Sequence, residues 1–332
     1  MRNDHKSPSG YKGRGTLLGI LAIFFWSTSI GFGRHLTEQM GTFRAAASIY
    51  MLGGLIACTV AILRGTTLQT LARAGLKYLW GCGGLFVAYS VCLYLALGFS
   101  VDREQAITVG LINYLWPALT LILAAPILRE PVRRGRLLLG ITVACLGILL
   151  SVGSADRHST WNLPQLHGTS ASPYGLALSA AVLWALYSNL SRRWGTHPSG
   201  EAVPVFLLAT GIFMSFLMLV FSEESHWTKR DLPELIYMAL VPTSLAYIFW
   251  EIAVRRGNFV LIAAFGYLTP LLSTWISVIY LAVRASLQLW IACIFVVAGA
   301  VICNWAFKKG LGAFQATTAP RRLRRGIHRT GP

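Results

Sequence analysis

Charged residues are scarce in this chain of 332 residues, and acidic residues are the scarcest, with 12 Asp and Glu against 29 Lys and Arg. Together these four residue types make up 12% of the sequence, about half the share of a soluble domain. Apolar residues make up 55%. Because so few charges cannot cover a globular surface in water, lipid must cover much of it. The composition therefore predicts an all-α polytopic membrane protein.

Motifs for catalysis and for metal or cofactor binding are also missing. The sequence has no carboxylate pair, zinc-ligand spacing, phosphate loop or nucleophile triad. Its six cysteines lie in apolar stretches without CxxC or Cys/His spacing, which is typical of packing residues rather than of disulfides or a metal site. We therefore expect no enzymatic activity, no cofactor and no metal. A membrane enzyme or a sensor would need polar catalytic groups at one membrane face, and none are found.

Apolar stretches long enough to cross a bilayer are, in contrast, abundant, since about 20 apolar residues span its hydrocarbon core. We expect ten transmembrane helices, at 16–34, 41–63, 76–99, 104–127, 135–152, 173–193, 201–221, 233–254, 258–282 and 286–307. The first stretch has no small-residue cleavage site, so we expect a transmembrane helix there rather than a signal peptide.

The net charge of +17 would suggest nucleic-acid binding in a soluble chain, but its distribution points to membrane orientation instead. With ten helices after a cytoplasmic N-terminus, 22 Lys and Arg fall on the cytoplasmic side and 7 outside. This asymmetry places both termini, the basic segments 1–15 and 308–332, in the cytoplasm. The basic C-terminal segment is also attracted to anionic lipid headgroups of the bilayer. We expect no nucleic-acid partner.

A tetrapeptide in the middle of the chain is repeated. Tyr-Leu-Trp-Pro at 114–117 recurs as Tyr-Leu-Thr-Pro at 267–270, each within a long apolar stretch. Upstream, Trp26 precedes Tyr89 by 63 residues, and a second Trp–Tyr pair at 184 and 247 has the same spacing. The chain is therefore predicted to contain one structural unit twice.

The two units would cover 16–152 and 173–307, joined by an outer linker at 153–172 that is rich in Ser, Gly, Thr and His. Each unit has five predicted helices. Because five is an odd number, the second unit begins on the opposite side of the membrane. We therefore expect two inverted five-helix repeats around a central cavity, an arrangement typical of transporters.

Pro117 and Pro270 lie at equivalent positions in the two units. Each removes a backbone donor inside an apolar helix and clashes with the carbonyl four residues earlier, that of Asn113 or Gly266. A freed carbonyl in lipid is tolerated where protein or cavity water satisfies it. We therefore predict that both prolines are hinges beside the cavity. A passive kink is the alternative for either proline alone.

Aromatic residues are predicted to line the cavity. Trp26 and Trp184 lie at mid-membrane depth, away from the headgroup belt where tryptophan is usually enriched. Flat rings with polar edges suit an aromatic ligand through stacking and a cationic amine through cation–π contact. Aromatic core packing is the alternative for any single ring. The candidates for substrate binding are Trp26, Tyr89, Tyr114, Trp116, Trp184 and Tyr187. Tyr247 and Tyr267 are the counterparts of Tyr89 and Tyr114 in the second unit.

Apart from acids at the first or second residue of a predicted helix, Glu251 is the one acid within these helices, which makes it a candidate for proton coupling. Arg255 follows it at i+4 near the cytoplasmic end, so an ion pair at the helix end is the alternative. Arg34 and His35 lie at the outer end of the first helix, where we expect them at the membrane interface.

From 16 to 307 the chain resembles the drug/metabolite transporter superfamily, in its EamA-repeat branch. Within that branch, Asn-Tyr-Leu-Trp-Pro at 113–117 and Phe-Trp-Ser-Thr at 25–28 are similar to the YddG-type aromatic amino acid exporters. The resemblance implies ten helices around a central cavity, export of aromatic amino acids across a bacterial inner membrane, and coupling to protons. It also assigns Trp26, Tyr89, Tyr114, Trp116 and Trp184 to the pocket. The second unit has Thr269 where the first has Trp116, so we expect a pocket with heavier stacking from the first unit.

The sequence thus predicts an alternating-access exporter of aromatic amino acids and related small metabolites. The alternative is an exporter of other metabolites, small amino acids or cationic drugs, because no side chain dictates recognition of a carboxylate or phosphate. Since the cavity lies within one chain, a monomer suffices.

Overall fold

All elements in the described part of the chain are helical. The computed structural model describes residues 8–66, 71, 74–128, 132–155, 171–194, 202–256 and 265–306. The elements are α1 (Pro8–Met40), α2 (Thr42–Leu63), η1 (Lys77–Cys82), α4 (Gly83–Gly98), α5 (Arg103–Asn113), α6 (Trp116–Leu128), α7 (Arg134–Ala155), α8 (Ser172–Trp194), α9 (Val203–Val220), η3 (Lys229–Asp231), α10 (Leu232–Met238), η4 (Ala239–Leu245), α11 (Ala246–Arg256), α13 (Thr269–Tyr280) and α14 (Leu287–Trp305).

Eight helical segments in these ranges are long and apolar enough to cross a membrane. They begin at residues 13, 42, 77, 103, 134, 203, 229 and 287. Two further predicted helices are not among the eight. The stretch 173–193 forms α8, which is less apolar because it contains four serines, Asn189 and two arginines. The stretch 258–282 is described only from 265, where it contains α13. The prediction of a helical, multi-pass membrane protein is confirmed, and the number ten stays a prediction.

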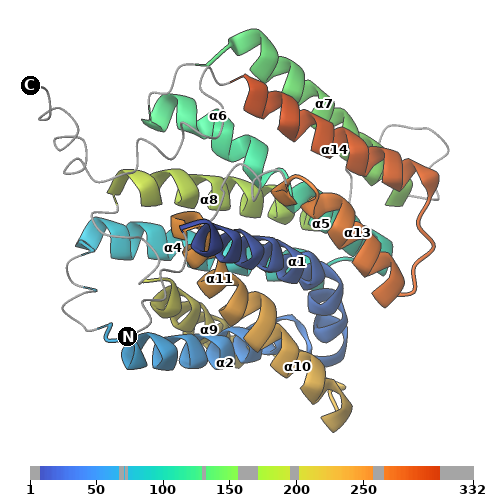
Figure 1. Cartoon of the computed structure of the whole chain (residues 1–332). Helices are drawn as coiled ribbons and strands as arrows, with labels where there is room; N and C mark the ends of the chain where they lie inside the picture. The colour runs from blue at the N-terminus through green and yellow to red at the C-terminus, as the bar shows by residue number, and fades with distance from the viewer. Residues whose placement is uncertain are drawn as a thin grey trace, which may run out of the picture.

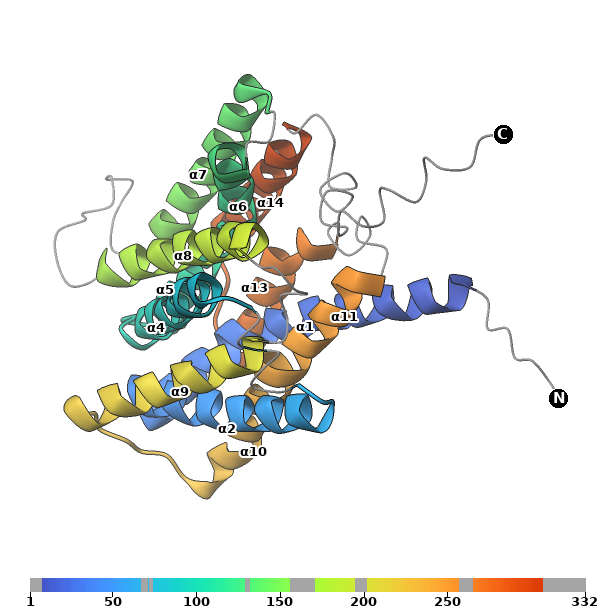
Figure 2. The same cartoon turned by 90° about the vertical axis from the view of Figure 1, so that its left-hand side faces the viewer.

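Two pairs of helices form opposite edges of the bundle. Figure 1 shows α7 beside α14 at one edge and α2 beside α9 at the other, and Figure 2 shows the same pairs after a quarter turn. Glycines allow both close approaches: a Cβ on Gly211 would lie 2.5 Å from the Met51 nitrogen, and one on Gly299 would lie 2.6 Å from the Ala144 nitrogen. These small residues let the backbones touch, as is common between helices in membranes.

Helices from the two halves of the chain also interleave between these edges. Helix α1 packs against α11 and α13, and α8 packs against α4 and α6. Helix α1 belongs to the first half of the chain and packs mostly on helices of the second. Helix α8 belongs to the second half and packs mostly on helices of the first. This interleaving brings the predicted aromatic residues of both halves into one region.

Both Tyr-Leu-x-Pro sequences coincide with a helix break. Tyr114 and Leu115 form a turn between α5 and α6, and Tyr267 and Leu268 form a turn just before α13. Each proline is then the second residue of the next helix, where its missing N–H is tolerated. The backbone hydrogen bonds around the two breaks match at an offset of 153 residues. At the first break, the Leu115 N–H donates to the Ile112 carbonyl at 3.0 Å and the Leu119 N–H to the Leu115 carbonyl at 3.0 Å. At the second break, the Leu268 N–H donates to the Phe265 carbonyl at 2.9 Å and the Leu272 N–H to the Leu268 carbonyl at 2.9 Å.

Candidate functional site

Trp184 lies at the centre of an aromatic cluster. The residue is on α8, and its neighbours come from α4, α6, α11 and α8 itself. Its ring centroid lies 4.7 Å from Tyr89, 5.0 Å from Tyr187, 5.9 Å from Phe86, 6.2 Å from Tyr247 and 6.3 Å from Trp116. These separations are in the range of favourable aromatic contacts. The structure thus brings together four of the six predicted binding residues: Tyr89, Trp116, Trp184 and Tyr187.

Trp26 lies on α1 at the other side of Tyr247. Its ring centroid is 5.2 Å from Tyr247 and 5.3 Å from Trp250, and its indole N–H donates to the Pro242 carbonyl in η4 at 3.1 Å. Tyr247 therefore links Trp26 to the cluster around Trp184. Two Trp–Tyr contacts cross between the halves of the chain, Trp26 with Tyr247 and Trp184 with Tyr89. The equal sequence spacing singled out the same four residues, but it paired Trp26 with Tyr89 and Trp184 with Tyr247, so each tryptophan contacts the tyrosine of the other half.

Tyr114 connects the first helix break to α1. The side chain is buried, and its hydroxyl donates to the Trp26 carbonyl across 3.5 Å. It also interacts with Ser273 on α13. The preceding residue, Asn113, is 4% exposed and interacts with Tyr89. The break at 114–115 therefore places a tyrosine and an asparagine among the aromatic rings.

Several rings of this cluster keep accessible surface although they lie in the interior of the bundle. Trp26, Tyr89, Trp116, Trp184 and Tyr247 are half-buried. Such surfaces can stack on an aromatic ligand, and the faces of the tryptophans attract a cationic amine. The rings themselves carry no charge, so they would bind by shape, stacking and polarity rather than by ion pairing.

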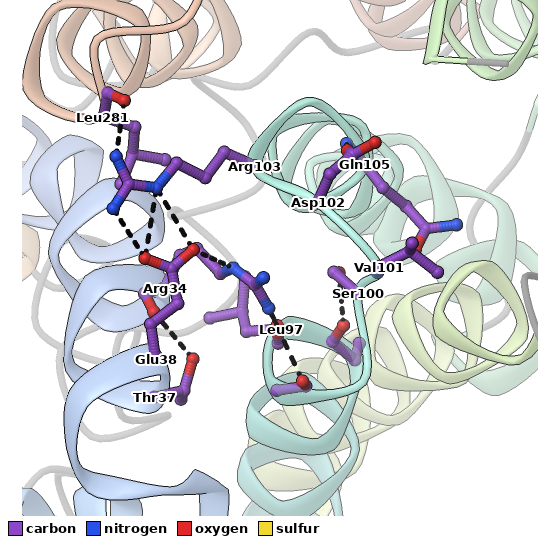
Figure 3. Close-up of polar contacts among 12 residues, drawn as sticks. Arg34, Thr37, Glu38, Leu97, Ser100, Val101, Asp102, Arg103, Gln105 and Leu281 are labelled. Atoms are coloured by element: carbon purple, nitrogen blue, oxygen red, sulfur yellow. Dashed lines mark hydrogen bonds and ion pairs between the residues drawn. The ribbon is translucent and has the colours of Figure 1, made fainter. Parts of the chain in front are cut away.

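A group of charged side chains lies where α1 ends. Figure 3 shows Glu38 between two arginines, with its Oε1 2.8 Å from Arg34 Nε and its Oε2 2.7 Å from Arg103 Nη2. Arg34 also donates to the Leu97 carbonyl at 2.6 Å, and Arg103 to the Leu281 carbonyl at 2.9 Å. We call these residues the Glu38 network. It joins α1, the end of α4, the start of α5 and the end of α13.

Arg34 differs from the expectation of an interfacial side chain, because the structure buries it to 7% exposure. The reason is that α1 continues to Met40, beyond the predicted end at residue 34, so that Glu38 lies one turn further along the same helix. A carboxylate at i+4 and a backbone carbonyl then satisfy the buried guanidinium.

His35, the neighbouring residue, contacts the second half of the chain. Its Nδ1 lies 2.7 Å from Oε2 of Glu234 on α10. Tyr280 of α13 interacts with the same carboxylate and stacks on Phe32 of α1, with ring centroids 3.9 Å apart. Together with the Glu38 network, these contacts tie both halves together at this end of the bundle.

Sequence reasoning missed Phe86 and the Glu38 network. Phe86 is fully buried and contacts Trp184, Tyr187, Phe206 and Tyr247, but an apolar ring in an apolar helix gives no distinguishing signal. Glu38 and Arg103 lie 65 residues apart, so their contact has no local signature. Glu251 is a residue of α11, but its side chain lies outside the described part of the structure.

Comparisons with known proteins agree on one family. The model of the EamA-like transporter family matches residues 13–153 and again 171–305. The chain is 31% identical to "Aromatic amino acid exporter YddG" of Escherichia coli over 90% of its length and 99% of the relative. It is 30% identical to the protein of that name from Salmonella typhimurium, over 89% and 98%. A relative of the same name from Ancylobacter novellus is 28% identical over 87% and 96%.

A solved crystal structure shares the fold. It covers 90% of this chain and 99% of its own, with a TM-score of 0.65 and 25% sequence identity. The family model matches most of the chain, in two successive segments that contain the two helix breaks. The chain belongs to the EamA-like transporter family.

Proposed function

We propose that this protein exports aromatic amino acids across a bacterial inner membrane by alternating access. The cluster around Trp184 carries the proposal, because it offers accessible aromatic faces from both halves of the chain. Relatives that align over nearly their whole length carry the name of aromatic amino acid exporters. Trp26, Tyr89, Tyr114, Trp116, Trp184 and Tyr187 would contact the substrate.

Ten helices in two inverted repeats are the architecture that we propose for this transport. The matched hydrogen bonds at the two breaks support a repeated unit, as do the two segments matched by the family model. The packing supports a two-fold relation: α2 meets α9 and α7 meets α14, which are equivalent helices, and the α1–α11 contact corresponds to the α8–α4 contact. Both termini would then lie in the cytoplasm, as the charge asymmetry predicts.

Alternating access requires that one end of the bundle is closed while the other admits substrate. The Glu38 network and the His35–Glu234 pair lie at the end that the charge distribution places outside. They would hold that end closed and break when substrate leaves. Pro117 and Pro270 would be the hinges, since each follows a break in an otherwise apolar helix.

Transport by the purified protein in liposomes tests this proposal. Preloaded vesicles should exchange radiolabelled tryptophan, phenylalanine and tyrosine in a counterflow assay. The same assay with small aliphatic amino acids and cationic drugs tests the alternative substrates. Exchange of these compounds but not of aromatic amino acids would contradict the proposed substrate class. The predicted proton coupling is tested by repeating the assay with a pH gradient across the vesicle membrane, once with the unmodified protein and once with Glu251→Gln.

A further inference from the structure

The two helix breaks differ in whether a neighbouring side chain donates a hydrogen bond to the backbone carbonyl that the proline leaves free. Pro270 deprives the Gly266 carbonyl of its usual donor, and the Thr269 hydroxyl replaces it at 2.7 Å. Pro117 does the same to the Asn113 carbonyl, but Trp116 stands where the second half has Thr269 and has no hydroxyl to donate. The second break therefore satisfies its own backbone, and the first lacks that side-chain donor.

Asn113 adds a second oxygen to this position. Its Oδ1 atom is buried and has no hydrogen-bond partner among the described residues. A buried acceptor without a donor destabilises a folded protein, so a side chain is rarely left in this condition without a role. The amide also lies next to Tyr89, which in turn contacts Trp184 at 4.7 Å. The unpaired oxygen is therefore part of the aromatic region and not a remote packing defect.

The chemistry of this position is that of a cation site without a fixed charge. It combines a backbone carbonyl, an amide oxygen and the negative end of the α5 dipole, since α5 ends at Asn113. Tryptophan faces close by add cation–π attraction. In transporters, such unwound carbonyls and half-helix C-termini hold cations at the centre of the membrane. Neutral acceptors also release a cation more readily than a carboxylate does, which suits a site that must be emptied in each cycle.

We propose that the break between α5 and α6 binds the α-ammonium group of the substrate, with the Asn113 amide oxygen and the Asn113 carbonyl as acceptors. This inference rests on the proposed function, because it presumes an amino acid in the aromatic cluster. The ring of the substrate would stack near Trp184 while its ammonium group donates to the break. The equivalent break in the second half would not bind the ammonium group, since the Thr269 hydroxyl already donates a hydrogen bond to the Gly266 carbonyl.

Three indole ligands separate the ammonium group from the ring. Tryptophan has the ammonium and the carboxylate, tryptamine has the ammonium alone, and 3-indolepropionate has the carboxylate alone. Equilibrium binding of each ligand to the purified full-length protein should give weaker affinity for 3-indolepropionate than for the two amines. In Asn113→Leu, affinity for tryptophan and tryptamine should fall by about tenfold or more, as expected for a lost hydrogen bond to a charged group. Affinity for 3-indolepropionate should not change.

Asn113→Asp keeps the shape and polarity of the side chain and provides a second variant should the leucine variant fold poorly. It should strengthen tryptamine binding and weaken 3-indolepropionate binding. Thr269→Val is the matched control at the second break, and it should leave all three affinities unchanged. Equal weakening of all three ligands in Asn113→Leu, or tryptamine binding that does not improve in Asn113→Asp, would overturn the inference.

The failure of this inference can be distinguished from the failure of the proposed function. Tryptophan that binds the unmodified protein but does not depend on Asn113 contradicts the ammonium site alone. If the unmodified protein binds none of the aromatic amino acids, the proposed substrate class is wrong, and the ammonium site is wrong with it.

Discussion

Glu38 accepts hydrogen bonds from two arginines at once, and these differ in burial. The Arg34 side chain is 9% exposed and that of Arg103 is 40% exposed. The cost of losing the carboxylate should therefore come chiefly from Arg34, which would remain buried without a counter-charge. Arg103 can turn toward water, so it should contribute little to this loss of stability.

Glu38→Gln should lower the stability of the protein by about 3 kcal/mol, the order expected for breaking a buried ion pair. Thermal unfolding of the purified protein in detergent would show a lower midpoint. Glu224→Gln is a matched control, because the Glu224 side chain is 95% exposed and its contact with His226 is 3.9 Å long. Equal midpoints for the two variants would show that the Glu38 network does not stabilise this end of the bundle.

At the scale of helices, the contact between α1 and α13 is the one that the proposed opening must change. A Cβ on Gly31 would lie 3.5 Å from the Ser277 Cβ, which is within the range of a disulfide. In contrast, α7 and α14 pack through glycines along their length and should move as one body. Ser154 and Ser286 are hydrogen-bonded at the end of that second contact.

A disulfide between Gly31→Cys and Ser277→Cys should stop transport, and a reducing agent should restore it. The measurement is tryptophan counterflow in liposomes, in a protein whose six natural cysteines are replaced. The control pair, Ser154→Cys with Ser286→Cys, should leave transport unchanged under oxidation. Full transport by the oxidised Gly31–Ser277 pair would contradict a separation of α1 from α13.

The breaks at Pro117 and Pro270 could be predicted from the sequence, because proline lacks the backbone N–H that the interior of a helix requires. The four residues Trp26, Tyr89, Trp184 and Tyr247 could be singled out by their equal spacing in the sequence, but their contacts across the two halves could not. The helix packing could not be predicted in the same way, since apolar helices have little contrast between their faces. Phe86 and the Glu38–Arg103 contact were missed because the partners lie far apart in the sequence. The Arg34–Glu38 pair at i and i+4 was missed because the first helix was predicted to end at residue 34. The unpaired oxygen of Asn113 depends on burial, which only the structure provides.

At the scale of the whole molecule, charge distribution and packing support the same arrangement. The excess of Lys and Arg on one side predicts cytoplasmic termini, and it assigns the end with the Glu38 network to the outside. The pairing of equivalent helices supports a two-fold relation between the halves, as two inverted repeats would have. The two lines of argument are independent, because one uses loop residues and the other uses helix contacts.

The orientation can be tested with reporters fused to the C-terminus. A fused green fluorescent protein should fluoresce, and a fused alkaline phosphatase should be inactive, because we expect the C-terminus in the cytoplasm. A phosphatase fused within the linker 153–172 should be active. An active phosphatase at the C-terminus would contradict ten spans with a cytoplasmic N-terminus.

The central claim is that rings from both halves form one binding site around Trp184. The most direct measurement is the affinity of the purified protein for radiolabelled tryptophan, before and after Trp184→Ala. We expect affinity to fall by about tenfold or more, because the change removes both stacking and buried apolar area. Trp275→Ala is the control, since Trp275 is 54% exposed on α13, and it should bind like the unmodified protein. Unchanged affinity in Trp184→Ala, or an equal loss in Trp275→Ala, would contradict the account.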